Sequence, residues 1–177
     1  MTTYVLGGGC FWCLDAVFRG LKGVSVVECG YAGGKTPTPT YEQVSTGTTG
    51  YAEVVRITFD ESIIPEETIL DIFFLIHDPT TLNRQGADTG TQYRSIMLFE
   101  DASQQSLFQT TLEKAQSIWE GPIVTELKEL ETFYLAEEEH QDYFNKHPES
   151  GYCSIVIAPK IIKARHAYAS WFKKEEE

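Results

Sequence analysis

Two cysteines stand three residues apart near the start of the chain, in the stretch GGGCFWC at residues 7–13. Three glycines precede Cys10, and Phe11 and Trp12 separate it from Cys13. A packed core has little use for three consecutive glycines, because each costs chain entropy and buries no side chain. An ordinary binding loop has little use for two thiols. The combination of a glycine turn, two thiols and two aromatic rings indicates chemistry on sulfur.

Cys10 is predicted to lie at the start of a helix. Residues 3–8 (TYVLGG) indicate a short strand that enters the glycine turn, and apolar residues at helical spacing follow Cys10. Unpaired backbone N–H groups and the positive end of the helix dipole lie at such a start. We therefore expect the reactive thiolate of Cys10 to be favoured over the thiol. The alternative is a buried cysteine that packs as a small hydrophobic residue.

The C-x-x-C spacing allows two other kinds of site. It is typical of thioredoxin-like redox dithiols, and it also occurs in zinc sites, which need three or four nitrogen or sulfur ligands. The sequence has no second C-x-x-C and no H-x-x-x-H pair, so we expect no metal site. Cys29 stands in an apolar segment and is expected to be buried and inert.

The rest of the chain alternates between strand-like and helix-like segments. Alternating apolar residues predict strands, and apolar residues three or four apart predict helices. The predicted strands cover residues 3–8, 24–34, 52–60, 93–100 and 123–130, with a short strand or extended segment at 152–160. The predicted helices cover residues 10–20, 65–78, 101–119, 136–147 and 158–174, and the predicted loops cover residues 34–40 and 80–92.

This order of segments predicts an α+β fold. We expect a two-layer sandwich with a mixed, largely antiparallel sheet, which is a ferredoxin-like core with added elements. The sequence shows no internal repeat and no linker, so a single domain over residues 1–177 is expected.

Composition limits the location and the partners of the chain. A net charge of −12 argues against nucleic acid and anionic membranes, which both attract basic surfaces. The longest apolar stretch, residues 69–77, is broken by Asp71 and is too short to cross a bilayer. No secretory signal is recognisable at the N-terminus, so we expect a cytoplasmic protein. In that reducing compartment four cysteines are not expected to form two structural disulfides.

Five blocks of the sequence together resemble the peptide methionine sulfoxide reductases of the A type. They are GGCFWC at 8–13, GYAGGKTPTPTYEQVSTGTTGYAEVV at 30–55, GADTGTQYRS at 86–95, EEEHQDYF at 137–144 and GYCSIVIAPK at 151–160. The blocks follow the family's order and cover nearly the whole chain. The resemblance implies an oxidoreductase that reduces methionine S-sulfoxide, free or in proteins, and repairs proteins after oxidative stress.

The resemblance also implies roles for individual residues. Cys10 matches the nucleophile, and Glu53 matches the acid beside the sulfoxide oxygen. Other matches form the substrate pocket, as an aromatic wall around the methyl group, two tyrosines that reach the oxygen and a supporting carboxylate: Phe11 and Trp12, Tyr41 and Tyr93, and Asp88. His140 is a further candidate that could orient a group of the site, and the alternative is a histidine on a helix surface. The family commonly has histidine where this chain has Tyr51, and often has glycine or serine where it has Cys13.

Sulfoxide reduction needs side chains of these types. A nucleophile must attack sulfur while a proton reaches the departing oxygen, and hydroxyl donors stabilise the negative charge on that oxygen. A carboxyl group in an aromatic pocket tends to keep its proton, because burial disfavours the anion. No flavin, haem, metal or other cofactor is required.

The oxidised nucleophile must then be recycled. Cys10 becomes a sulfenic acid, which condenses with a nearby thiol. Cys13 is near in sequence, whereas Cys153 lies in a glycine-containing segment that we expect to be mobile and that resembles the family's C-terminal G-Y-C version. We therefore expect the Cys10–Cys153 disulfide to form first, with Cys13 as a second-stage thiol. Thioredoxin is the expected reductant.

Two alternatives to this function stay open. A general disulfide oxidoreductase could use Cys10 and Cys13, but it would leave Glu53, Tyr41 and Tyr93 without a role. A redox sensor or methionine-binding module would not turn over at all. Turnover of a sulfoxide with dithiothreitol separates the three possibilities.

Overall fold

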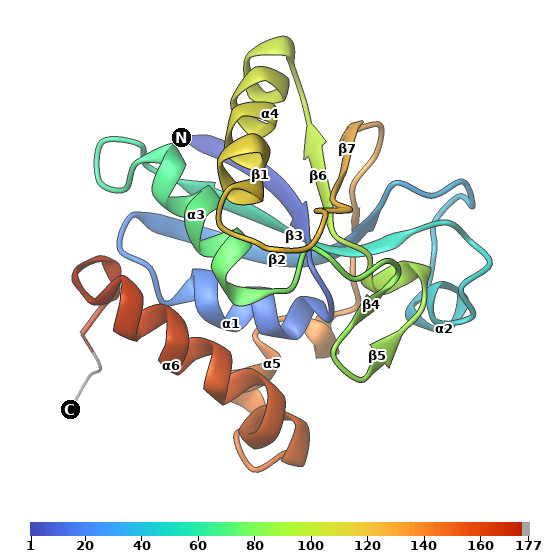
Figure 1. Ribbon diagram of the computed structural model, residues 1–177. Coiled ribbons are helices and arrows are strands. Elements are labelled where there is room, and N and C mark those ends of the chain that lie inside the picture. Colours follow the sequence, from blue (N-terminus) through green and yellow to red (C-terminus); the bar gives the residue numbers. More distant parts are fainter. Residues whose placement is uncertain (175–177) are drawn as a thin grey trace.

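The computed structural model describes residues 1–174 and has a six-stranded sheet at its centre (Figure 1). The strands run in the order β7-β6-β1-β3-β2-β8, and all neighbours are antiparallel except β6 and β7. Their bounds are β1 Thr2–Gly7, β2 Val24–Ala32, β3 Ala52–Phe59, β6 Ile96–Phe99, β7 Glu126–Glu129 and β8 Tyr134–Leu135. A separate two-stranded hairpin consists of β4 Arg84–Gln85 and β5 Asp88–Thr89.

Helices cover one face of this sheet. Their bounds are α1 Phe11–Arg19, α2 Tyr41–Ser45, α3 Glu66–Ile76, α4 Ala102–Gln116, α5 Tyr143–Lys146 and α6 Ala158–Ala167. Phe18 of α1, Phe73 of α3 and Phe108 of α4 belong to one hydrophobic cluster with the sheet. A smaller cluster lies on the opposite face, where Leu130 and Phe133 cover it. Within residues 1–174, none of the helices is both long and apolar enough to span a bilayer.

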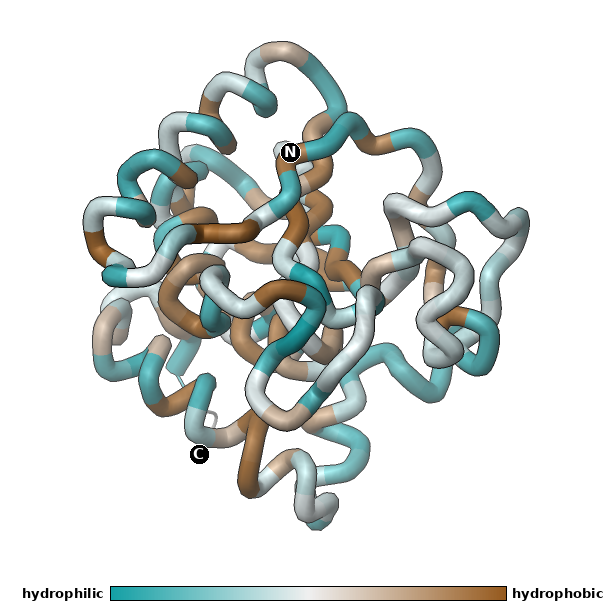
Figure 2. The backbone as a smooth tube through the Cα atoms, turned by 45° about the vertical axis from the view of Figure 1, so that its right-hand side comes forward, coloured by the Kyte–Doolittle hydropathy of each residue, from teal (hydrophilic) through white to brown (hydrophobic). Residues whose placement is uncertain are grey.

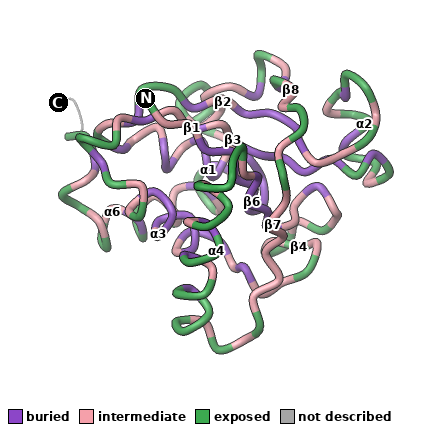
Figure 3. The backbone as a smooth tube through the Cα atoms, turned by 90° about the horizontal axis from the view of Figure 1, so that it is seen from above, coloured by how far each residue is buried: buried purple, intermediate pink, exposed green. Residues whose placement is uncertain are grey.

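The predicted α+β fold with a mixed, largely antiparallel sheet is confirmed. Elements β1, α1, β2, β3, α3 and β6 follow the ferredoxin-like β-α-β-β-α-β order, with the strands arranged β6-β1-β3-β2. Alternation along β1 sends Tyr4 and Leu6 to the helical face and Val5 to the other. Hydrophobic residues gather in the interior segments of the chain (Figure 2), and β2 and β3 carry long buried stretches while much of α4 is exposed (Figure 3).

The predicted helix over residues 136–147 is wrong. This segment forms a 3-10 turn at Glu138–His140 and the short helix α5, and between them Asp142 has a left-handed backbone with φ of 54°. The break occurs where side chains tie the segment to the sheet. The Gln141 amide accepts from the N–H of Cys29 at 2.8 Å and donates to its carbonyl at 2.9 Å. These bonds fix the segment against β2 and prevent a continuous helix.

The predicted short strand or extended segment over residues 152–160 is also wrong. Cys153–Ile157 form a π-helical turn that continues directly into α6. Cys153 and Ile157 are buried while Ile155 between them is exposed, and this four-residue spacing fits a helix rather than a strand. The β-branched residues of the segment concealed that period.

Candidate active site

Cys10 lies at the junction between β1 and α1, where the glycine run brings the chain close to its neighbours. It is the N-cap residue of α1 and is 8% exposed. A Cβ atom on Gly7 would come within 2.8 Å of the carbonyl oxygen of Glu53 on β3. Gly9 has a φ of 91°, a conformation that favours glycine. The glycines therefore allow the turn to press Cys10 against β3.

The expectation that the helix start favours a thiolate on Cys10 is wrong for the free protein. Burial raises the pKa of the Cys10 thiol well above its ordinary value, and a hydrogen bond with Cys13 raises it further. The backbone N–H of Trp12 acts in the opposite direction, but its effect is smaller. The interaction with Cys10 lowers the pKa of Cys13, and burial opposes this effect in part.

Glu53 lies on β3 beside the start of α1 and is 1% exposed. Its Oε1 accepts a hydrogen bond of 3.2 Å from the backbone N–H of Phe11, the residue after Cys10. Burial raises the pKa of this carboxyl group to about 8, although the Phe11 N–H lowers it in part. Glu53 therefore holds its proton at neutral pH, as the sequence indicated.

Tyr41 and Tyr93 belong to separate elements that meet at this site. Tyr41 is the first residue of α2, and Tyr93 ends a 3-10 turn at Thr91–Tyr93. Burial raises the pKa of both phenols, and ionisation of the neighbouring Glu53 or Cys10 would raise it further. The Tyr41 ring stacks on that of Phe11, with centroids 6.5 Å apart, and the raised pKa values keep both hydroxyls protonated as hydrogen-bond donors.

Asp88 joins the site through Tyr152, a residue that sequence reasoning missed. The Tyr152 hydroxyl donates a hydrogen bond of 2.7 Å to Asp88 Oδ2 and lies 3.9 Å from the Cys13 Sγ. Its ring meets the Trp12 ring edge-on at 5.8 Å. The only signal for this residue was its place before Cys153 in the G-Y-C stretch.

The aromatic wall has an accessible part and a buried part. Trp12 is partly exposed and stacks on Tyr143, with ring centroids 3.7 Å apart and an interplanar angle of 5°. Its indole N–H donates to His140 Nδ1 at 3.2 Å, and the His140 ring lies 4.4 Å from that of Tyr41. Phe11 is 0% exposed, so it supports the wall from within the core.

The remaining cysteines are both fully buried. Cys153 is 0% exposed on its π-helical turn, and burial raises the pKa of its thiol. Cys29 is also 0% exposed, and its Sγ lies 3.6 Å from the Asp15 carboxylate. Burial, followed by the charge of Asp15, raises the pKa of Cys29 well above its ordinary value, which fits the inert cysteine expected from the sequence.

Tyr51 fills the position at which the family commonly has histidine. Its hydroxyl donates to the carbonyl of Thr36, and its ring packs on Gly34 and meets Tyr134 edge-on at 5.8 Å. A Cβ atom on Gly34 would lie 2.3 Å from the Tyr51 ring, so the two positions fit each other closely. These contacts give Tyr51 a packing role in the 34–36 loop.

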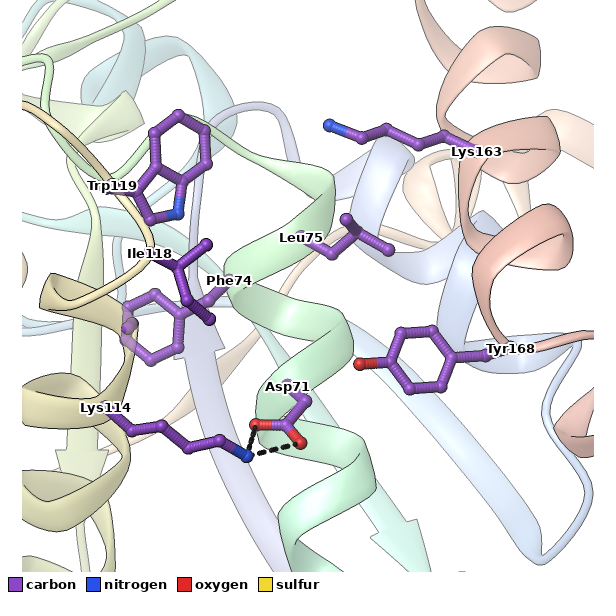
Figure 4. Close-up of a pocket in the computed structure, with 9 residues that line it drawn as sticks. Asp71, Phe74, Leu75, Lys114, Ile118, Trp119, Lys163 and Tyr168 are labelled. Atoms are coloured by element: carbon purple, nitrogen blue, oxygen red, sulfur yellow. Dashed lines mark hydrogen bonds and ion pairs between the residues drawn. The ribbon is translucent and has the colours of Figure 1, made fainter.

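A pocket of 360 Å³ lies elsewhere, between α3, α4 and α6 (Figure 4). Asp71 and Lys114 form an ion pair across it at 3.2 Å, and Trp119, Lys163 and Tyr168 line its other sides. None of its lining residues is a cysteine. The cysteines that the sequence singles out therefore do not line this pocket.

Comparisons with known proteins point to one family. A family model described as peptide methionine sulfoxide reductase matches residues 2–172. The peptide methionine sulfoxide reductase MsrA of Pseudarthrobacter chlorophenolicus is 58% identical over 171 residues, which are 97% of this chain and 98% of that protein. The crystal structure of Mxr1 from Saccharomyces cerevisiae in reduced form is similar, with a TM-score of 0.81 and 34% identity, and the match covers 86% of this chain and 88% of that one.

A second structure of the yeast protein shares the fold. It is Mxr1 in complex with Trx2, with a TM-score of 0.58 and 24% identity over 80% of this chain and 84% of that one. The family match spans nearly the full length of the chain, and it includes the stretch in which Cys10 lies against Glu53. The chain belongs to the peptide methionine sulfoxide reductase family.

Proposed function

We propose that this enzyme reduces methionine S-sulfoxide to methionine, with Cys10 as nucleophile and Glu53 as acid. The observation that carries the proposal is the buried Glu53 carboxyl group, whose pKa of about 8 keeps it protonated, bonded to the residue that follows Cys10. A nucleophile and a proton donor at one end of one helix are what transfer of a sulfoxide oxygen requires.

The first step moves oxygen from methionine to cysteine. The Cys10 Sγ attacks the sulfoxide sulfur while Glu53 protonates the oxygen. The oxygen then moves to Cys10: a new S–O bond forms on Cys10, the S–O and S–S bonds at the methionine sulfur break, and the Cys10 thiol proton returns to Glu53. The products are methionine and a Cys10 sulfenic acid. Cys10 loses two electrons, and the methionine sulfur gains them. Tyr41 and Tyr93 donate hydrogen bonds to the oxygen as negative charge develops on it.

Substrate binding uses the aromatic and polar sides of the site. Trp12 offers its accessible face to the methyl group on the polarised sulfur. Phe11 and His140 support this wall from behind. Asp88, held by the Tyr152 hydroxyl, supplies a supporting carboxylate on the other side of Trp12.

The second step forms an intramolecular disulfide. In place of the Cys153 expected from the sequence, Cys13 is the first thiol to attack the Cys10 sulfenic acid. Cys153 lies within a helix rather than in an extended segment, and burial raises the pKa of its thiol. Cys13 stands on the first turn of α1, where its backbone N–H donates to the Cys10 carbonyl at 3.1 Å, and the pKa of its thiol is lowered, which favours the attacking thiolate. Its attack on the sulfenic acid releases water. Exchange with Cys153 then passes the disulfide to Cys13–Cys153 and frees Cys10.

A thioredoxin-type dithiol is the reductant that we propose for the final disulfide. The yeast relative's complex with Trx2 supports this partner. Oxidised proteins and free methionine sulfoxide are the proposed substrates. We also propose a cytoplasmic location, because Cys10 must be a free thiol at the start of each turnover and a reducing compartment keeps it so.

The deciding experiment supplies the two sulfoxide epimers of methionine separately, with dithiothreitol as reductant. We expect consumption of the S epimer, no consumption of the R epimer, and no turnover by a folded Cys10→Ser variant. Insulin reduction by the wild-type protein serves as the comparison for a general disulfide oxidoreductase. Rapid insulin reduction without sulfoxide turnover would favour that alternative, and activity of Cys10→Ser would remove Cys10 from the mechanism.

A further inference from the structure

Glu137 bonds two residues near the proposed substrate site, Tyr31 and Tyr41, which an ordinary surface acid would not do. It follows β8, and its side chain is 39% exposed. Its Oε1 accepts a hydrogen bond of 3.2 Å from the hydroxyl of Tyr31, and its Oε2 accepts one of 3.3 Å from the backbone N–H of Tyr41. Tyr41 is the first residue of α2, so this N–H has no partner within its own helix. The carboxylate of Glu137 thus ties α2 to β2.

The same carboxylate faces His140, which in turn holds Trp12. Oε2 of Glu137 lies 3.6 Å from His140 Nε2, and Trp12 donates its indole N–H to His140 Nδ1 at 3.2 Å. Because Nδ1 accepts this hydrogen bond it carries no proton, so the ring proton lies on Nε2. Burial lowers the pKa of His140, which also favours the neutral ring. Nε2 is buried and has no hydrogen-bond partner among residues 1–174. This N–H faces the carboxylates of Glu137 and Glu139, which lie 3.6 and 3.8 Å from Nε2.

We propose that Glu137 is a positioning residue that holds both sides of the methionine pocket at once. It holds Tyr41 directly through the backbone, and it holds Trp12 through His140. The inference rests on the proposed function, because it assigns Tyr41 and Trp12 to the substrate pocket. With substrate in place, the contact between Glu137 and His140 shortens to a hydrogen bond, as is common in enzyme sites that tighten on binding.

A metal site formed by Glu137, Glu139 and His140 is the competing interpretation of this cluster, since their ligand atoms lie within 4.8 Å of one another. The Trp12 hydrogen bond argues against it. The nitrogen that faces the carboxylates carries a proton and offers no lone pair to a cation. Binding a metal there would require His140 to change tautomer and Trp12 to lose its partner.

Three variants test the proposal. Glu137→Ala removes both carboxylate oxygens, Glu137→Gln retains one acceptor oxygen, and Glu139→Ala is the matched control. Glu139 also lies near His140 Nε2, at 3.8 Å, but it is 77% exposed and bonds neither Tyr31 nor Tyr41. For Glu137→Ala we expect KM for methionine S-sulfoxide to rise about tenfold, the effect of losing one to two hydrogen bonds, while kcat changes far less. Glu137→Gln should recover part of this loss, and Glu139→Ala should leave KM unchanged.

A spectrum of the indole N–H groups reports on the pocket without any need for activity. Tryptophan labelled with ¹⁵N gives one signal for each indole, and a Trp12→Phe variant identifies that of Trp12. This signal should move in Glu137→Ala and stay in place in Glu139→Ala. An unmoved signal together with an unchanged KM, or an equal effect of Glu139→Ala, would overturn the proposal. If the wild-type protein reduced no sulfoxide, the proposed function would fail while the indole signal still tested the positioning.

Discussion

The backbone N–H of Phe11 donates a hydrogen bond of 3.2 Å to the carboxyl oxygen of Glu53. This bond joins the helix that carries Cys10 to the strand that carries the acid. It uses one of the N–H groups that every helix start leaves free, and it leaves the second carboxyl oxygen available for the substrate.

The role of Glu53 as acid sets the pH dependence of the reductase step. Its pKa of about 8 means that the proton needed by the oxygen is present below that pH and is lost above it. We expect single-turnover formation of methionine to fall as pH rises through about 8. Glu53→Gln should lower the rate about 10²-fold or more and abolish this pH limb, as for a positioned general acid. A variant that retained the wild-type rate would show that Glu53 is not the acid.

Glu53 also affects stability, in a direction opposite to that of His77. Burial raises the pKa of Glu53 from 4.5 to about 8, so the folded state binds more protons in that window and stability falls as pH rises. Burial lowers the pKa of His77 from 6.5 to about 4, so the folded state binds fewer protons and stability rises with pH over that range. The two effects oppose each other between pH 4.5 and 6.5, and above pH 6.5 the effect of Glu53 continues while that of His77 has ended, with the lowered pKa of Cys13 acting against Glu53.

Urea unfolding at pH 6.5 and pH 8 measures this effect. We expect the wild-type free energy of unfolding to decrease by about 2 kcal/mol between these two values, given about 1.4 kcal/mol for each unit of pKa difference. In Glu53→Gln this decrease should disappear. An equal decrease in both proteins would contradict the raised pKa of Glu53.

The order of disulfide formation can be read from two serine variants. Both Cys13→Ser and Cys153→Ser should form about one equivalent of methionine per enzyme in a single turnover, because neither residue takes part in oxygen transfer. Cys13→Ser should accumulate the Cys10 sulfenic acid, detected by dimedone labelling. Cys153→Ser should instead contain a Cys10–Cys13 disulfide, detected by peptide mass mapping. The reverse pattern would make Cys153 the direct resolving thiol, as the sequence suggested.

Gly7 tests the packing of the glycine run against the acid-bearing strand. A methyl group at this position would lie 2.8 Å from the Glu53 carbonyl oxygen and 2.8 Å from the Ile96 side chain. We expect Gly7→Ala to lower the free energy of unfolding by about 1–3 kcal/mol, as overpacking does in other cores. Gly151→Ala is the control, because nothing lies within 4 Å of its added Cβ atom. Chemical denaturation of both variants gives the comparison, and equal midpoints would contradict the tight fit.

The sequence was sufficient to predict those parts of the fold in which periodicity reflects burial. The alternation in 3–8 and 52–60 and the helical spacing after Cys10 gave β1, β3 and α1 to within a few residues. The segment at 152–160 was misread because its β-branched residues have strand propensity, whereas its burial follows a period of four. Local propensity cannot reveal which neighbours a segment will meet.

The candidate site was likewise predictable from the sequence only in part. The motifs were sufficient to select Cys10 and Glu53, but the effect of burial on the Cys10 thiol could not be read from its place at a helix start. Tyr152 and Glu137 were missed because their importance lies in bonds to Asp88 and Tyr41, which are 64 and 96 residues away in the chain. Such pairs become visible only after the fold brings them together.

Burial of the Cys10 thiol affects how readily the reduced enzyme reacts with peroxide. Hydrogen peroxide oxidises thiolates that are exposed, whereas Cys10 is 8% exposed and its pKa is raised. We therefore expect the reduced enzyme to react slowly with peroxide, so that sulfenic acid on Cys10 arises mainly from the sulfoxide substrate. Each Cys10 sulfenic acid then corresponds to one methionine sulfoxide that has been reduced. The consumption of reductant is therefore proportional to the number of methionines repaired.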